Sequence, residues 1–136
     1  MKIDGKCLCG HVTYEGVVDP DKVAVCHCAD CQNHSASAFG LVVHLEAFTL
    51  TSGAMKTYEK TADSGTRRAL TFCPERGTRI YAQTVGEGTS FWGLRVGTCN
   101  QRAKLTPKLQ VWCQSRLPWV GDLGGLPEFP AQPDLG

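Results

Sequence analysis

The sequence predicts a single, mainly β domain. With 136 residues, the chain is shorter than the length at which one hydrophobic core divides into several domains. Hydrophobic residues make up 42% of the chain and charged residues 20%, which is typical of a folded protein rather than a disordered one. Apolar residues mostly alternate with polar ones over short segments, and 15 glycines supply turns between them. This alternation is typical of strands joined by turns.

The alternation predicts six or seven strands and very little helix. The expected strands lie at residues 11–18, 41–50, 67–72, 79–84, 90–98 and 109–113. Turn signals separate them at Gly53 and at residues 19–21, 64–65 and 86–88. The one segment with helical character is 29–37. From residue 121 onward the chain is rich in glycine and proline, so we expect residues 121–136 of this single domain, 1–136, to form an extended tail that covers the body or is partly mobile.

The charge balance and the first residues bear on partners and compartment. The chain has 14 basic and 13 acidic residues, and a net charge of +1 gives no electrostatic footprint for nucleic acid or an anionic membrane. The first ten residues lack the apolar segment of a secretory signal, and no stretch approaches the roughly 18 apolar residues of a membrane span. We therefore expect a cytoplasmic protein that has neither a nucleic acid nor a membrane as its partner. In that compartment, closely spaced cysteines bind metal or react more often than they form disulfides.

The sharpest motif is Cys-x-Cys-x-x-Cys, formed by Cys26, Cys28 and Cys31. Zinc is the expected ion, because it accepts thiolates tetrahedrally and is redox inert. Three sulfurs from one loop leave a fourth position for water or substrate, as in catalytic zinc sites. The alternative is a closed structural zinc whose fourth ligand comes from elsewhere. His27 lies between two of these cysteines on an extended segment, so its side chain should point away from them, beside the site or at the surface.

A second group of cysteines is incomplete. Cys7 and Cys9 form a Cys-x-Cys pair before Gly10, and Cys73 begins the sequence Cys-Pro-Glu-Arg-Gly. A zinc knuckle would read Cys-Pro-x-Cys-Gly there, but Arg76 stands in place of the second cysteine. A guanidinium has no lone pair to offer a metal. The first site therefore has three evident sulfurs.

The other cysteines, aromatic residues, histidines and arginines favour structural roles. Cys99 and Cys113 have apolar neighbours and are expected in the core. The tryptophans are expected in the core or at its rim, and no basic-aromatic interleaving supports nucleic-acid binding. His34 is the one isolated histidine near enough to the second cysteine group to lie beside it. Arg67 and Arg68 could meet substrate carboxylates, although a solvated strand edge is the favoured interpretation.

Taken together, these motifs resemble the glutathione-dependent formaldehyde-activating enzyme family, also called the CENP-V/GFA family. The resemblance rests on Cys-x-Cys-Gly near the start, Cys-His-Cys-x-x-Cys, Phe-Cys-Pro before Gly-x-Arg-Ile, and Trp-x-x-Ser-Arg-x-Pro-Trp at residues 112–119. It implies a β-dominated Mss4-like fold, a structural zinc on Cys7, Cys9, Cys73 and the position now held by Arg76, and a catalytic zinc on Cys26, Cys28 and Cys31. It also implies carbon-sulfur lyase chemistry, in which glutathione and formaldehyde are joined to, or released from, S-hydroxymethylglutathione.

Arg76 departs from the family pattern and leaves three explanations open for the first site. Zinc could bind Cys7, Cys9 and Cys73 with water or a substitute ligand such as Cys99. The site could instead be free of metal, with Arg76 pairing a thiolate or a carboxylate. The arginine could also be a variant of the natural residue.

The function that we predict is a zinc-dependent carbon-sulfur lyase acting on a thiol adduct of formaldehyde or another small aldehyde. Its partners would be a glutathione-like thiol and the aldehyde, and Cys26, Cys28 and Cys31 would hold the catalytic ion. Asp30 and His27 are the nearest candidates for a general base. One alternative is a non-enzymatic, zinc-stabilised β module that binds a protein or thiol partner. A thiol redox enzyme is a weaker alternative, because no Cys-x-x-Cys pair stands apart from the metal-ligand clusters.

Overall fold

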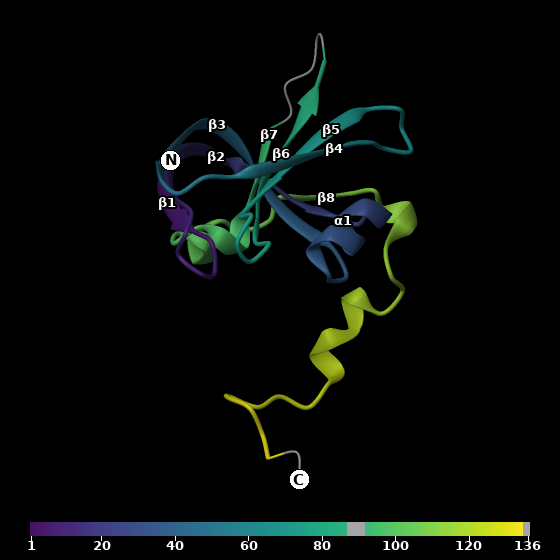
Figure 1. The fold of residues 1–136 in the computed structure, drawn as a ribbon. Helices are drawn as coiled ribbons and strands as arrows, with labels where there is room; N and C mark the ends of the chain where they lie inside the picture. The colour runs from purple at the N-terminus through teal and green to yellow at the C-terminus, as the bar shows by residue number, and fades with distance from the viewer. Residues whose placement is uncertain (87–91, 135–136) are drawn as a thin grey trace.

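The computed structural model describes residues 1–86 and 92–134, and over these residues the chain folds around one sheet of eight strands (Figure 1). Seven strands follow the order β1-β2-β3-β7-β6-β5-β4, and β8 pairs with β2. All pairings are antiparallel except that of β8 with β2. The prediction of a mainly β fold is confirmed.

The strands and helices have the following bounds. The strands are β1 (Lys2–Lys6), β2 (Thr13–Cys26), β3 (Gly40–Ser52), β4 (Lys56–Thr61), β5 (Arg67–Phe72), β6 (Arg79–Val85), β7 (Trp92–Arg95) and β8 (Leu109–Val111). The α-helix among the described residues is α1 (Ala29–Ser35), within the predicted segment 29–37. Short 3-10 helices lie at Val96–Thr98, Arg102–Lys104, Cys113–Ser115 and Val120–Gly125.

Strand β2 is longer than predicted. The sequence Asp-Pro-Asp at residues 19–21 was expected to end a strand at residue 18, but β2 continues to Cys26. The register against β3 shifts between Asp19 and Val23, so Pro20 lies in an irregular stretch where no ladder hydrogen bond is required of it. The strand therefore reaches from the turn that holds the first two cysteines to the first cysteine of the second group.

The other predicted strands differ mainly at their ends. Segment 67–72 matches β5, whereas segment 90–98 becomes the short β7 followed by a 3-10 helix at Val96–Thr98. Residues 90–91 of that segment, and residues 87–88 of the predicted turn, lie outside the described residues. Strands β1 and β4 were not predicted. Every residue of β4 is exposed, so it has no apolar face to produce an alternation.

The core is formed by buried side chains of β1, β2, β3, β6 and β7, together with the segments that join them. Its largest fully buried side chains include Tyr14, Leu45, Ile80 and Leu94. Phe48 and Trp92 extend this core as an aromatic cluster, in which the ring of Phe48 lies 5.0 Å from that of Tyr14 and 5.0 Å from that of Tyr81. Cys99 is fully buried, as predicted.

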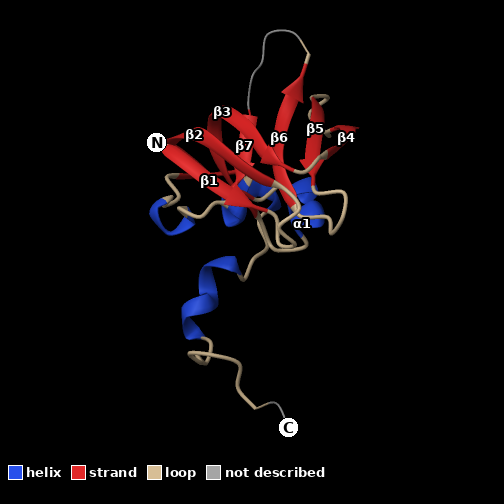
Figure 2. Ribbon diagram, turned by 60° about the vertical axis from the view of Figure 1, so that its left-hand side comes forward, coloured by secondary structure: helices blue, strands red, loops and turns tan. Residues whose placement is uncertain are grey.

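The C-terminal part differs from the prediction. Residues 121–125 are not extended, because Val120–Gly125 forms 3-10 turns. The tail runs away from the sheet in both views rather than covering it (Figures 1 and 2). Cys113 is exposed in a 3-10 turn that follows β8, so its assignment to the core was wrong. Trp112 and Trp119 are about half exposed, at 46% and 50%.

Candidate metal centres

Two clusters of cysteine sulfurs form in the described part of the chain. Cys7, Cys9 and Cys73 make the first cluster, and Cys26, Cys28 and Cys31 make the second; in each, the sulfur atoms all lie within 4.8 Å of one another. All of these cysteines are free thiols. The structure therefore brings together both predicted sets of ligands.

In the first cluster, a tight turn between β1 and β2 presents Cys7 and Cys9. The Cys7 N–H donates to the carbonyl of Val12 at 3.0 Å, and the Val12 N–H donates back to the Cys7 sulfur at 3.2 Å. Gly10 turns the chain with a φ of 80°, which favours glycine. The first two cysteines of the chain are therefore held by backbone geometry and not by a metal alone.

Cys73 joins the first cluster from the turn between β5 and β6. Its sulfur lies 3.7 Å from that of Cys9, which lies 3.5 Å from that of Cys7. Sulfurs around a tetrahedral zinc, with zinc-sulfur bonds of about 2.3 Å, stand roughly 3.8 Å apart. The donor set and its spacing therefore fit a zinc ion.

Arg76 takes no part in the first cluster. The residue is exposed, and its guanidinium donates to the carbonyl of Glu75 at 2.9 Å rather than to a thiolate. Cys99, a candidate for the substitute ligand, is not in the cluster either; its thiol donates to the side-chain oxygen of Gln101 at 3.3 Å. The expectation that Cys99 could replace the fourth cysteine is therefore wrong, and the cluster has three protein sulfurs.

The thiols of the first cluster differ in acidity. Burial raises the pKa of Cys7, but hydrogen bonds from the Val12 N–H and from the neighbouring thiols outweigh it and bring the pKa to about 7. The pKa of Cys9 is raised: the His11 N–H lowers it, but burial and the two neighbouring thiols prevail. One thiol of this cluster is thus ready to bind a cation near neutral pH.

The second cluster is built at the start of α1. Cys26 ends β2, and Cys28 is the N-cap residue of α1, whose sulfur accepts a hydrogen bond from the Cys31 N–H at 3.2 Å. Cys26 and Cys31 are each 9% exposed, whereas Cys28 is more accessible. The three sulfurs therefore surround a point that solvent approaches from the side of Cys28.

Two of the three thiols in the second cluster have raised pKa values, so without a metal ion they stay protonated near neutral pH. The hydrogen bond with Cys26, together with burial, raises the pKa of Cys31 to about 11. Burial also raises the pKa of Cys28, whereas the hydrogen bond from Cys31 lowers that of Cys26. A metal that binds all three sulfurs must displace protons from at least two of them.

Each of the two candidates for a general base has a side-chain partner outside the cluster, although Nδ1 of His27 is buried without a hydrogen-bond partner among the described residues. His27 is fully buried, which rules out the surface position and leaves the other predicted position, beside the site; its Nε2 lies 2.8 Å from the side-chain oxygen of Gln110 on β8. Asp30 forms an ion pair with Lys60 on β4. His27 thus connects β2 to β8, and Asp30 connects α1 to β4.

A histidine of α1 and two arginines from distant strands lie near the second cluster. His34 lies beside Cys31, as predicted, and its Nε2 is 3.0 Å from Nη2 of Arg95 on β7. Arg68 on β5 is half-buried, and burial, together with the nearby Arg95, lowers the pKa of its guanidinium, while the thiols of the cluster act in the opposite direction and do not prevail. Arg67 is exposed to solvent, as predicted, and pairs with Glu59 at 2.7 Å. The predicted strand edge is wrong for both arginines, because β5 lies between β4 and β6.

Sequence reasoning could not have separated these two arginines. Alternation along β5 puts Arg67 in phase with the buried Ala69 and Thr71, so it would have placed Arg67, and not Arg68, on the buried side. Arg95 had no signal, because nothing in the sequence places β7 beside α1.

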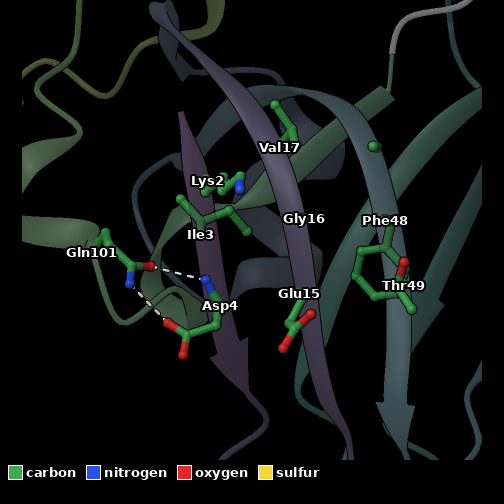
Figure 3. Close-up of a pocket in the computed structure, with 10 residues that line it drawn as sticks. Lys2, Ile3, Asp4, Glu15, Gly16, Val17, Phe48, Thr49 and Gln101 are labelled. Carbon is green, nitrogen blue, oxygen red and sulfur yellow. Dashed lines mark hydrogen bonds between the residues drawn. The ribbon is translucent and has the colours of Figure 1, made fainter.

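A groove lies elsewhere on the molecule, over β1, β2 and β3 (Figure 3). It has a volume of about 510 Å³, and it contains no cysteine of either cluster. On one side Gln101 is held by Asp4: the Asp4 N–H donates to Gln101 at 3.0 Å, and the Gln101 amide donates to the Asp4 carboxylate at 2.7 Å (Figure 3). These bonds fasten β1 to the segment after β7.

Comparisons with known proteins agree with this architecture. Among the residues that the structure describes, no helix is long and apolar enough to cross a membrane. No curated protein sequence matches the chain significantly. A solved structure of a Rhodobacter sphaeroides protein is similar with a TM-score of 0.57 and 20% sequence identity, over 81% of this chain and 99% of that chain, which shows a shared fold. The family model described as glutathione-dependent formaldehyde-activating enzyme matches residues 2–115. The chain belongs to this family of glutathione-dependent formaldehyde-activating enzymes.

Proposed function

We propose that the protein is a zinc-dependent carbon-sulfur lyase, which joins a glutathione-like thiol to formaldehyde or another small aldehyde and catalyses the reverse reaction. The observation that carries the proposal is the second cluster. It supplies three sulfur ligands from one short segment, and Cys28 is its accessible side. A tetrahedral ion held there would keep one position for substrate. The free thiols suit a reducing compartment, and we propose a cytoplasmic location.

The reaction needs little chemistry from the protein. The thiol sulfur attacks the carbonyl carbon, a carbon-sulfur bond forms, and the thiol proton ends on the new hydroxyl oxygen. Zinc, when bound, would supply a Lewis acid that stabilises the substrate thiolate or polarises the aldehyde oxygen. The contribution of Cys26, Cys28 and Cys31 is to hold that ion, while α1 and the end of β2 fix the direction from which substrate approaches.

We propose a structural role for the first cluster. Zinc on Cys7, Cys9 and Cys73 would join the turn after β1 to the turn after β5. Because Arg76 points to the carbonyl of Glu75, water would complete the coordination.

The test is the rate at which glutathione and formaldehyde exchange with S-hydroxymethylglutathione, measured by NMR exchange spectroscopy with the metal-loaded protein. We expect exchange faster than the spontaneous rate, and loss of that acceleration in Cys28→Ser together with loss of metal from one site. Cys113→Ser is the matched control, because Cys113 is exposed and outside both clusters. Exchange at the spontaneous rate with both sites loaded would refute the lyase and favour the non-enzymatic zinc-stabilised module.

A further inference from the structure

We propose that residues 117–134 form an arm by which two copies of this chain associate, with the arm of each copy packed on the body of the other. The body is residues 1–116. The arm contains no ligand of either cysteine cluster, and it lies beyond residues 2–115, which the family model matches. The inference therefore goes beyond the proposed activity and does not depend on it.

The first observation is a series of exposed apolar side chains along the arm. Trp119, Leu123, Leu126 and Phe129 are all between 50% and 61% exposed. The hydrophobic core formed by the described residues includes nothing after Leu105. Single exposed apolar side chains are common on soluble proteins, but a series on one projecting segment marks a surface that another protein covers.

The second observation is the direction of the arm. The body holds its base, because the side chain of Gln32 on α1 donates to the carbonyl of Ser115 at 3.0 Å. Trp112 turns the chain after β8 with a φ of 57°, in the left-handed region. From there the arm runs away from the sheet in both views (Figures 1 and 2). Its apolar side chains are thus carried away from the core of their own chain to where a second molecule can cover them.

The third observation is charge, which selects the partner. All 14 basic residues lie in the body, against 10 acidic ones, so the body has a net charge of +4. The arm has no basic residue and three acidic ones. Two of these, Asp122 and Glu128, are exposed and form no ion pair within the described part of the chain. A second copy therefore offers the arm a body of opposite charge, and two such contacts close a symmetric dimer.

Proline lowers the entropy that the arm loses on binding. Four of the seven prolines of the chain lie in the arm, at positions 118, 127, 130 and 133. Each fixes its own φ, so an arm that contains them has fewer conformations to give up when it packs on a partner. Because Gln32 belongs to the helix that carries Cys31, the interface begins beside the second metal centre.

The first experiment measures association of the metal-loaded, full-length chain by sedimentation equilibrium. We expect a dimer with a dissociation constant of about 1 µM or less. The triple variant Leu123→Ser, Leu126→Ser, Phe129→Ser should raise that constant at least about 100-fold. Tyr58→Ser is the matched control, because Tyr58 is 57% exposed but lies on β4, and it should change the constant by less than about twofold. Equal metal content and equal thermal midpoints in diluted, monomeric samples would show that the triple variant is folded.

A charge reversal tests the choice of partner. Glu128→Lys should raise the dissociation constant by about 10-fold, because it places a positive charge against a positive body. Glu46→Lys makes the same change of net charge at an exposed position of the body, and it should not weaken the dimer.

Cross-linking distinguishes a second copy from the arm's own body. Chains labelled with nitrogen-15 are mixed with unlabelled chains, and a carbodiimide joins carboxylates to nearby lysines. We expect mass spectrometry to find Asp122 or Glu128 of one label joined to body lysines of the other.

Three results would overturn the inference. A wild type that stays monomeric at 100-fold higher concentration than the expected constant would remove the dimer. A dimer that survives in the triple variant would place the interface on another surface. Cross-links only within single chains would mean that the arm folds back on its own body.

Discussion

At the scale of single residues, position 5 requires glycine because there is no room for a larger side chain, and not because of its backbone conformation. A Cβ at this position would lie 2.3 Å from the carbonyl oxygen of Thr98 and 2.3 Å from the hydroxyl of Tyr14. Tyr14 is itself buried and bonded to the Thr98 hydroxyl at 2.7 Å, so neither neighbour can move freely. We expect Gly5→Ala to lower the free energy of unfolding by about 1–3 kcal/mol in urea titrations. Gly97→Ala, with open space around it, should change it by less than about 0.5 kcal/mol, and equal effects would contradict this account.

The sequence predicted that residues meet at a site only where those residues are close together in the sequence. Cys26, Cys28 and Cys31 lie within one short segment, so spacing alone predicted that their sulfurs meet. Arg68 and Arg95 reach the same cluster from two separate strands, and only the pairing order of the sheet brings them there. Single-sequence patterns carry no information about that order.

At the scale of elements, the cap of α1 and the metal site share Cys28. Its sulfur accepts the Cys31 N–H, which is the role that serine or threonine fills at most helix starts. In metal-free protein we expect Cys28→Ala to be less stable than Cys28→Ser by about 0.5–2 kcal/mol, because serine keeps the cap and alanine does not. Both variants should lose the metal of the second cluster. Urea unfolding with chelator and metal analysis measure the two effects, and equal stability of the two variants would show that the cap contributes nothing.

Elements were predictable where one face of a strand is buried. Strand β5 alternates between buried and accessible residues and was found with its correct bounds, whereas the fully exposed β4 was missed. The predicted strand ended too early, at residue 18, because a proline usually ends a strand. Only the shifted register of β2 against β3 shows how Pro20 is accommodated.

At the scale of the whole molecule, a metal bound in the first cluster would act as a cross-link. Its sulfurs join positions 64 residues apart, whereas those of the second cluster span one short segment. A metal that closes a long loop removes more entropy from the unfolded chain than one that closes a short loop. Chelation should therefore lower the midpoint of thermal unfolding mainly through loss of the first site.

In the metal-loaded protein, Arg76→Cys should raise that midpoint by several degrees and slow the loss of metal to chelator. Glu75→Cys, which adds a thiol one position away, should do neither; the same gain in both variants would contradict the role of position 76.

The hydrogen bonds between β1 and the segment after β7 can form only late in the synthesis of the chain. Asp4 is bonded to Gln101, 97 residues later. At about 5–20 residues per second, a ribosome takes roughly 5–20 s to make the intervening chain. Strand β1 is therefore made several seconds before its partner Gln101, and Cys7 and Cys9, in the turn after β1, precede Cys73 by several seconds. The second cluster is complete as soon as Cys31 emerges, so it is the first of the two able to capture a metal ion in the nascent protein.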